Sequence, residues 1–318
     1  MDLTGELYSF WLALSFVWGA IWGSFLNVVI HRLPHGHSVV RPPSHCPRCS
    51  ATLRWWHNVP ILSWVALRAR CAFCGAPISP RYPLVELLTA VLSLATFMLA
   101  VRMVPDAALG DVLAVWVLRF TFVALLVAIT FIDLDLRIIP HELSVGGLVV
   151  GLGVSPFIGS FTGVDLATSA LGAALGGGII FLIIQVYWLV RRREGMGGGD
   201  FVMMAMLGAW LGYEAVVFVL FASSLQGTVA AIVLYVAGVG RGGAERAAGG
   251  QAGEGDVDVE GDVDGEGDVD VEGAAGDPAP EGFRTMEIPF GPFLALAALE
   301  WMYFESFIRD AVVGWLGL

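Results

Sequence analysis

Long, uninterrupted apolar stretches are the feature that most constrains the fold of this chain. Of its 318 residues, 57% are hydrophobic and 14% are charged, whereas soluble domains are roughly 45–50% apolar and about 25% charged. An apolar stretch of about 20 residues is long enough to cross a bilayer as a helix. The sequence therefore predicts an all-α polytopic membrane protein with about eight transmembrane helices and a lipid bilayer around it.

The expected spans follow one another through most of the chain. They lie near residues 8–30, 84–104, 111–132, 143–161, 166–190, 201–221, 224–240 and 290–315. The first has no small-residue cleavage site, so we expect a retained helix rather than a signal peptide. Tyr213, Glu214 and the stretch 223–227 interrupt the apolar run between residues 201 and 240.

The distribution of arginine predicts the orientation. The segment 31–82 carries seven arginines, and three more occupy positions 191–193. Because positive charge is enriched in cytoplasmic loops, both clusters are expected on the cytoplasmic side of the membrane. Eight spans agree with this assignment, since both clusters then face inward and both termini face outward.

A strongly acidic segment precedes the last expected span. Residues 240–287 hold 14 of the 29 acidic residues and 3 of the 17 basic residues, and the sequence GEGDVDVEG occurs twice. Such a composition predicts a disordered, solvated loop. Calcium binding is the alternative, although no full EF-hand pattern is present. No basic stripe with interleaved aromatic residues occurs, so nucleic acid is not an expected partner.

All four cysteines fall into one arginine-rich loop as two C-x-x-C pairs. The pairs are Cys46 with Cys49 and Cys71 with Cys74, separated by 21 residues. This spacing is typical of a four-thiolate zinc site, and a reducing cytoplasm disfavours disulfides. Four thiolates leave no open position for water, so the sequence predicts a structural Zn²⁺ rather than a catalytic one.

Two aspartates stand where apolar runs end. Asp133 follows the apolar stretch 121–132, and Asp200 follows a glycine-rich segment and precedes another apolar run. Ionisable groups near membrane depth usually face a protein interior or a wet cavity. Two adjacent carboxylates share a proton, so one can deprotonate a water molecule while the other polarises a peptide carbonyl. This pairing predicts peptide hydrolysis.

Each aspartate also has a purely structural interpretation. Asp200 precedes an apolar helix and could be its N-cap. Asp133 and Arg137 have the i, i+4 spacing of a helical ion pair, and Asp135 could lie at the interface. The chemical interpretation therefore depends on these features occurring together.

The combination of these segments resembles the bacterial type IV prepilin peptidases, which are membrane aspartic proteases with a G-x-G-D motif. Six segments carry the resemblance in chain order: Gly23–Pro34, the double C-x-x-C module, Gly75–Glu86, Ile132–Asp135, Glu194–Phe201 and Ile288–Leu294.

The resemblance implies a function and a catalytic pair. Asp133 and Asp200 match the catalytic aspartates, and the implied substrates are the leaders of type IV prepilins or type II secretion pseudopilins. Many members then methylate the new N-terminus with S-adenosylmethionine, and the cysteine loop is associated with that bifunctional form. Glu86 and Glu194 also match family positions, without an assigned step.

Under this interpretation the chain has five parts. They are a first transmembrane helix (1–30), a cytoplasmic zinc-binding loop domain (31–82), a transmembrane catalytic core (83–240), an acidic cytoplasmic loop (241–287) and a last transmembrane helix (288–318).

Two positions depart from the family pattern, and two other functions compete with it. His141 replaces an aspartate after Pro140, and Val202 replaces a lysine; these changes bear on substrate choice and methylation. A non-enzymatic membrane assembly protein with a zinc knob is one alternative. A proton-coupled transporter that uses the same aspartates is another, but it predicts inverted repeats that the sequence does not display.

Overall fold

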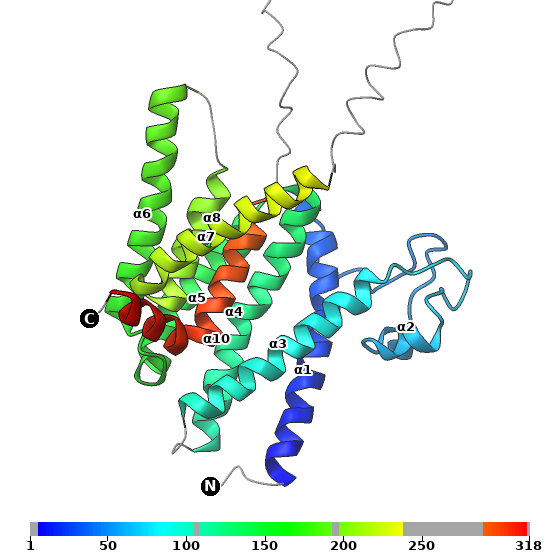
Figure 1. Ribbon diagram of the computed structural model, residues 1–318. Helices are drawn as coiled ribbons and strands as arrows, with labels where there is room; N and C mark the ends of the chain where they lie inside the picture. The colour runs from blue at the N-terminus through cyan, green and yellow to red at the C-terminus, as the bar shows by residue number, and fades with distance from the viewer. Residues whose placement is uncertain (1–5, 105–107, 193–196, 238–288, 317–318) are drawn as a thin grey trace, which may run out of the picture. The chain divides into compact units, whose positions relative to one another are not determined.

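The computed structural model describes residues 6–104, 108–192, 197–237 and 289–316, and this part of the chain is almost entirely helical. The predicted acidic loop at 241–287 and Glu194 lie outside the described residues. The helices are α1 (Glu6–Arg32), α2 (Leu62–Ala66), α3 (Arg81–Met103), α4 (Leu109–Leu136), α5 (His141–Thr162), α6 (Leu166–Arg191), α7 (Gly198–Leu211), α8 (Tyr213–Val236) and α10 (Gly291–Leu316), as Figure 1 shows. No strand occurs among these residues, so the predicted all-α class is confirmed.

Six of the described helices are long and apolar enough to cross a membrane, rather than about eight. They are α1, α3, α4, α5, α6 and α8. The chain is thus a multi-pass membrane protein, and the difference in span number has two local causes. The first is that α7 has only 14 residues, which makes it about 21 Å long, whereas the hydrocarbon layer is about 30 Å thick. The second is that α10 departs from helical geometry at Phe304 and carries Glu305 and Arg309 beyond that point.

Of the two interruptions in the segment 201–240, the one at Tyr213 and Glu214 adjoins the break between α7 and α8, whereas the stretch 223–227 does not interrupt the helix. The chain turns at Gly212, whose φ of +82° is readily adopted by glycine. The polar stretch 223–227 continues as helix within α8. The hydroxyls of Ser223 and Ser224 find their hydrogen-bond partner inside this helix, since both donate to the carbonyl oxygen of Leu220. The described residues up to Gln226 and from Pro289 onward belong to one compact unit, and the end of α8 from Gly227 onward belongs to a second.

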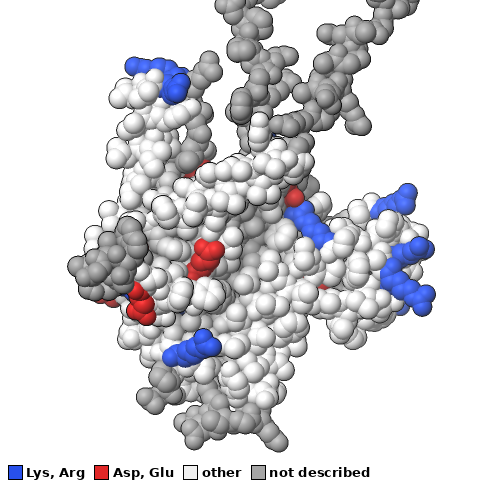
Figure 2. All heavy atoms as spheres, in the orientation of Figure 1, with Lys and Arg blue, Asp and Glu red and all other residues white. Residues whose placement is uncertain are grey.

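Apolar side chains cover most of the outside of the helices in the first unit. Large apolar side chains such as Val17 on α1, Val149 on α5 and Leu182 on α6 are exposed on the outside of these helices. Figure 2 shows one face, on which charged side chains are few and arginines gather over the cysteine-containing segment and the end of α6. This surface is suited to a bilayer and unsuited to water.

Small residues allow α1 and α3 to pack at close range. A Cβ at Gly19 would lie 2.5 Å from the Cβ of Ser93, and one at Gly23 would lie 2.7 Å from the Cα of Glu86. The Ser93 hydroxyl donates to the carbonyl oxygen of Ser15 at 2.7 Å. In lipid, such close packing and interhelical hydrogen bonds are what hold helices together.

Glycines also set the contact between α6 and α7, and therefore the position of Asp200. A Cβ on Gly172 or on Gly208 would overlap the backbone of the other helix, and Gly176 faces the carbonyl of Met204 in the same way. These pairs show that α6 and α7 run antiparallel, with Asp200 opposite residue 180. Because α6 continues to Arg191, it extends about 16 Å beyond the level of Asp200.

Filling the α6–α7 contact is predicted to destabilise the protein. Gly172→Ala should force the two backbones apart, at a cost of about 1–3 kcal/mol for overpacking, and lower the Tm of the purified protein by several degrees. Gly178→Ala on the same helix is the matched control, since a Cβ there meets no other atom within 4 Å. Equal Tm values for the two variants would contradict this packing account.

Candidate functional site

The four cysteines lie on two nearly identical backbone turns. In the first turn, the Cys46 amide donates to the Ala51 carbonyl, and the Ser50 amide donates to the Cys46 carbonyl. In the second, the Cys71 amide donates to Ala76, and Gly75 donates back to Cys71. Each turn contains a left-handed residue four positions after its first cysteine, with φ of +55° at Ser50 and +70° at Gly75. The two turns thus present their sulfurs in the same way.

The sulfur atoms come together as the spacing predicted. All four Sγ atoms lie within 4.8 Å of one another, and Cys46 and Cys74 are 3.9 Å apart. A tetrahedral Zn²⁺ with Zn–S bonds of about 2.3 Å requires sulfur separations of about 3.8 Å. Amide hydrogen bonds from Cys49 and Arg48 lower the pKa of Cys46 to about 6, whereas the pKa of Cys49 is raised to about 11, so in the metal-free cluster one thiol ionises before its neighbour. A bound metal favours the thiolate at each of its ligands. The four cysteine sulfurs are therefore arranged so that they could hold a metal ion.

Asp133 lies in the last turn of α4 and is almost fully buried, with 4% of its surface exposed. Its Oδ2 accepts a hydrogen bond of 2.9 Å from the amide of Gly291, the first residue of α10. Arg137 ends α4 in a left-handed conformation, with φ of +56°. This C-cap turns the chain away from the helix axis and leaves the Asp133 carboxylate facing α10.

Asp200 lies in the first turn of α7 and is half-buried. The N-cap of this helix is Gly197, so the structural alternative in which Asp200 is itself the N-cap is wrong. At the start of α7, position 199 requires glycine, because a Cβ there would lie 2.8 Å from the Cβ of Ile139. This contact holds the start of α7 against the segment between α4 and α5.

The two aspartates are close enough to interact electrostatically. Burial, and then the charge of Asp133, raise the pKa of Asp200 to about 6. Asp200 belongs to the short helix α7, which is not among the six membrane spans. A pair of carboxylates in which one resists ionisation can hold a single proton between them near neutral pH. Such a pair can act as a combined general acid and general base.

Asp135 has a different neighbourhood from Asp133. It lies on the opposite side of the last turn of α4 and forms an ion pair of 2.6 Å with Arg81, the first residue of α3. The interfacial position expected from the sequence agrees with its exposed side chain. The pair lines a cavity of about 250 Å³ together with Asn27, Ile30 and His31 of α1 and with His35, which lies just beyond the end of α1.

Glu86 connects the cysteine-containing segment to the membrane helices. Its buried carboxylate accepts a hydrogen bond of 2.7 Å from the amide of Ile61. Ile61 has a φ of +62° and a ψ of −51°, a strained conformation for a β-branched residue. This hydrogen bond stabilises the turn, which leads directly into α2.

Gly291 is a site residue whose part the sequence did not reveal. It belongs to a segment that contributed to the family resemblance, but neither its residue type nor its spacing pointed to Asp133. A Cβ at this position would lie 2.5 Å from Asp133 Oδ2. The only available signal was a glycine beside a proline at the start of the last apolar run.

Metal content is the first test of the cysteine cluster. We predict that purified protein carries about one Zn²⁺ per chain by elemental analysis. Cys46→Ser should lose most of this metal, because three thiolates bind it far more weakly. His45→Ala is the matched control, since the neighbouring His45 side chain contacts the Pro43 carbonyl, and it should retain the metal. Full zinc content in the cysteine variant would show that the cluster does not hold it.

Comparisons with known proteins give two adjoining family matches. Residues 17–100 match the bacterial peptidase A24 N-terminal domain, and residues 120–232 match the type IV leader peptidase family. The two matched segments contain the cysteine cluster and the two aspartates, respectively. No solved structure matches the chain.

Several proteins whose sequences are similar to this chain share one description. The prepilin leader peptidase/N-methyltransferase of Myxococcus xanthus is 43% identical over 75% of this chain and 66% of its own length. The proteins of that description from Aeromonas hydrophila and Neisseria gonorrhoeae are 38% and 37% identical, over 84% and 85% of their own lengths. The match to the Aeromonas protein covers 74% of this chain.

Proposed function

Since this chain belongs to the type IV leader peptidase family, we propose that it is a membrane aspartic endopeptidase that removes the leader peptides of type IV prepilins or pseudopilins and then N-methylates the new terminus. The observation that carries the peptidase assignment is the position of Asp133 in the last turn of α4 and of Asp200 in the first turn of α7, near enough that, besides burial, the charge of Asp133 raises the pKa of Asp200. Both aspartates lie within the segment 120–232 that matches the family.

The surroundings of the two carboxylates suggest different roles. The Gly291 amide donates to Asp133, and a hydrogen bond of this kind favours the ionised carboxylate. We therefore assign the shared proton to Asp200. Asp133 removes a proton from water as the water oxygen adds to the scissile carbonyl carbon, while Asp200 protonates the carbonyl oxygen. The proton on Asp133 then passes to the leaving amine as the C–N bond breaks, while one hydroxyl of the tetrahedral intermediate returns its proton to Asp200 as the C=O bond reforms.

The arginines near the site support the proposed membrane orientation. Because positive charge is enriched in cytoplasmic loops, the seven arginines of residues 31–82 and those at the end of α6 favour a cytoplasmic location for these helix ends, at a bacterial inner membrane. The ends of α4 and α10 that carry Asp133 and Gly291 meet there, as the hydrogen bond between them requires. A leader peptide would thus be cut at the cytoplasmic face.

The N-methyltransferase activity needs a methyl donor, and S-adenosylmethionine supplies a methyl group from its sulfonium when bound. A cavity of about 540 Å³ lies between α1 and the cysteine-containing segment, and its lining includes Arg32, Trp55 and Asn58. Its volume falls in the range of small-molecule sites. Arg32 offers donors to a carboxylate, and the Trp55 ring offers a π-face to a cation. These residues fit the donor, and we propose that they hold it.

Removing either carboxylate's charge is predicted to stop cleavage. Asp133→Asn and Asp200→Asn should each lower leader cleavage by about 10³-fold or more, because an amide can neither take up nor share the proton. The measurement is the mass of the N-terminus of a co-expressed prepilin, with membrane accumulation of each variant as the control for folding.

The same variants separate the two activities. A synthetic peptide that begins at the mature N-terminus should still be methylated by Asp200→Asn, because the proposed donor cavity lies in residues 17–60. Cleavage at the normal rate by Asp200→Asn would rule out the catalytic pair. It would favour a membrane assembly protein or a transporter.

Gly291 provides an independent test of the geometry. Gly291→Ala places a methyl group against Asp133 Oδ2 and should displace the carboxylate or the start of α10. Since misplacement of a catalytic group by about 1 Å can cost roughly 100-fold, we expect kcat to fall about 10- to 100-fold with prepilin binding retained. Ala297→Gly, elsewhere on α10, is the control for general effects on this helix. An unchanged kcat in Gly291→Ala would contradict the role given to this amide.

A further inference from the structure

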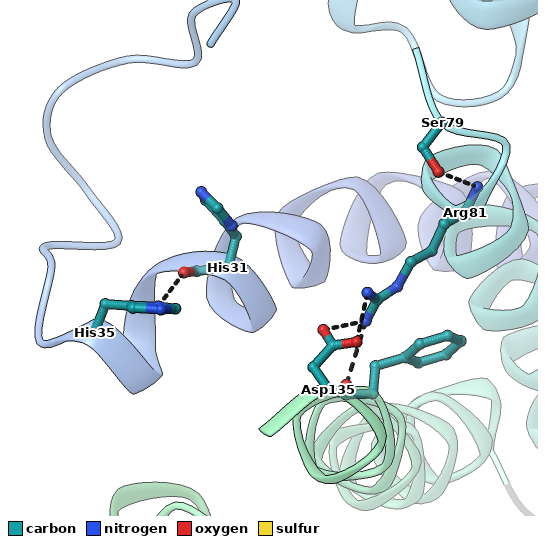
Figure 3. A network of polar contacts seen from close by, with 6 residues as sticks. His31, His35, Ser79, Arg81 and Asp135 are labelled. Atoms are coloured by element: carbon teal, nitrogen blue, oxygen red, sulfur yellow. Dashed lines mark hydrogen bonds and ion pairs between the residues drawn. The ribbon is translucent and has the colours of Figure 1, made fainter. Parts of the chain in front are cut away.

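The Arg81 side chain contacts the end of α4 through hydrogen bonds and through an aromatic ring. Its Nη1 and Nη2 donate to the two carboxylate oxygens of Asp135 at 2.7 and 2.6 Å, and Nη2 also donates to the Phe131 carbonyl at 3.2 Å. The guanidinium lies over the Phe131 ring, 5.2 Å from its centroid. Figure 3 shows Arg81 reaching from the start of α3 to Asp135. One side chain thus contacts the turn of α4 that contains Asp133.

This turn of α4 is held from two sides. On one side the Gly291 amide contacts Asp133, and on the other Arg81 contacts Asp135 and Phe131. Asp133 lies between the two residues that Arg81 binds. A shift or rotation of the last turn of α4 would therefore break both sets of contacts, and with them the placement of the Asp133 carboxylate.

Arg81 is joined to the cysteine turns by a short, hydrogen-bonded segment. The Cys71 amide donates to Ala76, the Ile78 amide donates to the Ala69 carbonyl at 2.7 Å, and the Trp64 indole donates to the Ile78 carbonyl at 3.1 Å. The Ser79 hydroxyl then accepts from the Arg81 amide, which Figure 3 also shows. The position of the second cysteine turn therefore fixes the start of α3.

We propose that Arg81 is a positioning residue for the peptidase, through which the cysteine module (residues 46–78) sets the position of Asp133. The proposal rests on the peptidase function proposed above. Arg81 and Asp135 are each 38% exposed at the side chain, so their ion pair adds little to global stability. The ion pair instead fixes the last turn of α4 relative to the start of α3, since a bidentate contact sets orientation as well as distance. It also joins the two segments that match separate family models.

The direct test is a double-mutant cycle on prepilin cleavage. Arg81→Ala and Asp135→Asn should each lower kcat about 10- to 100-fold with KM changed less than threefold, and the double variant should lose no more than either single one. Arg102→Ala, at the far end of α3, is the matched control and should cleave normally. Unchanged kcat in Arg81→Ala, or a loss confined to KM, would overturn the proposal.

Two further variants address folding and specificity. Arg81→Lys keeps the charge but loses the bidentate geometry, so its kcat should fall between those of the wild type and Arg81→Ala. Exchanging the partners (Arg81→Asp with Asp135→Arg) should restore part of the kcat lost in the single variants. If Arg81→Lys cleaves no better than Arg81→Ala and the exchange restores nothing, the ion pair is not what positions Asp133.

The link to the cysteine module is tested by combining variants. Cys74→Ser should lower kcat when Arg81 is present and should add little to the loss in Arg81→Ala, whereas zinc content should fall only in the variants that lack Cys74. Fully additive losses would show that the module acts without Arg81. Asp133→Asn, assayed in parallel, separates the two hypotheses: its normal activity would refute the peptidase assignment, and its inactivity beside a fully active Arg81→Ala would refute only the coupling.

Discussion

In hydrocarbon, every backbone amide and carbonyl must find a partner within the protein, and this constraint shapes the whole molecule. Helices satisfy it along their length, but the last carbonyls and first amides of each helix remain open. The polar chemistry of this chain accordingly lies at helix ends. Asp133 is in the last turn of α4, Asp200 is in the first turn of α7, and the amide of Gly291 begins α10. The site is built from the places where a membrane helix has unpaired groups to offer.

Close packing brings these ends together. The helices of the first unit approach one another through small residues. The contact of Gly172 with Gly208 sets the position of α7 along the axis of α6. Gly199 against Ile139 then fixes the start of α7 beside the end of α4. Because no hydrophobic effect drives helices together inside lipid, the fit of these surfaces is the main source of the arrangement. The electrostatic coupling of Asp133 and Asp200 is a consequence of that fit.

The cysteine module is joined to the membrane helices by two acidic residues on different helices. Glu86 of α3 accepts the strained Ile61 amide, and Asp135 of α4 binds Arg81 at the start of α3. Both contacts involve the first two turns of α3, which directly follow the second cysteine turn. The four-cysteine cluster and the end of α4 that carries Asp133 are thus connected through one short stretch of helix, which also joins the two segments that match separate family models.

The sequence by itself determined the helical membrane class and the four-cysteine cluster. Apolar run length decides whether a helix can span, and the C-x-x-C spacing decides how two sulfurs lie on one turn, so both are local properties. It did not determine where the last helices break, at Gly212 and at Phe304. Nor did it reveal the partners of Asp133 and Asp135. Gly291 and Arg81 are 158 and 54 positions away from them, and only the packing of helix ends, which follows from three-dimensional fit rather than from periodicity, places them there.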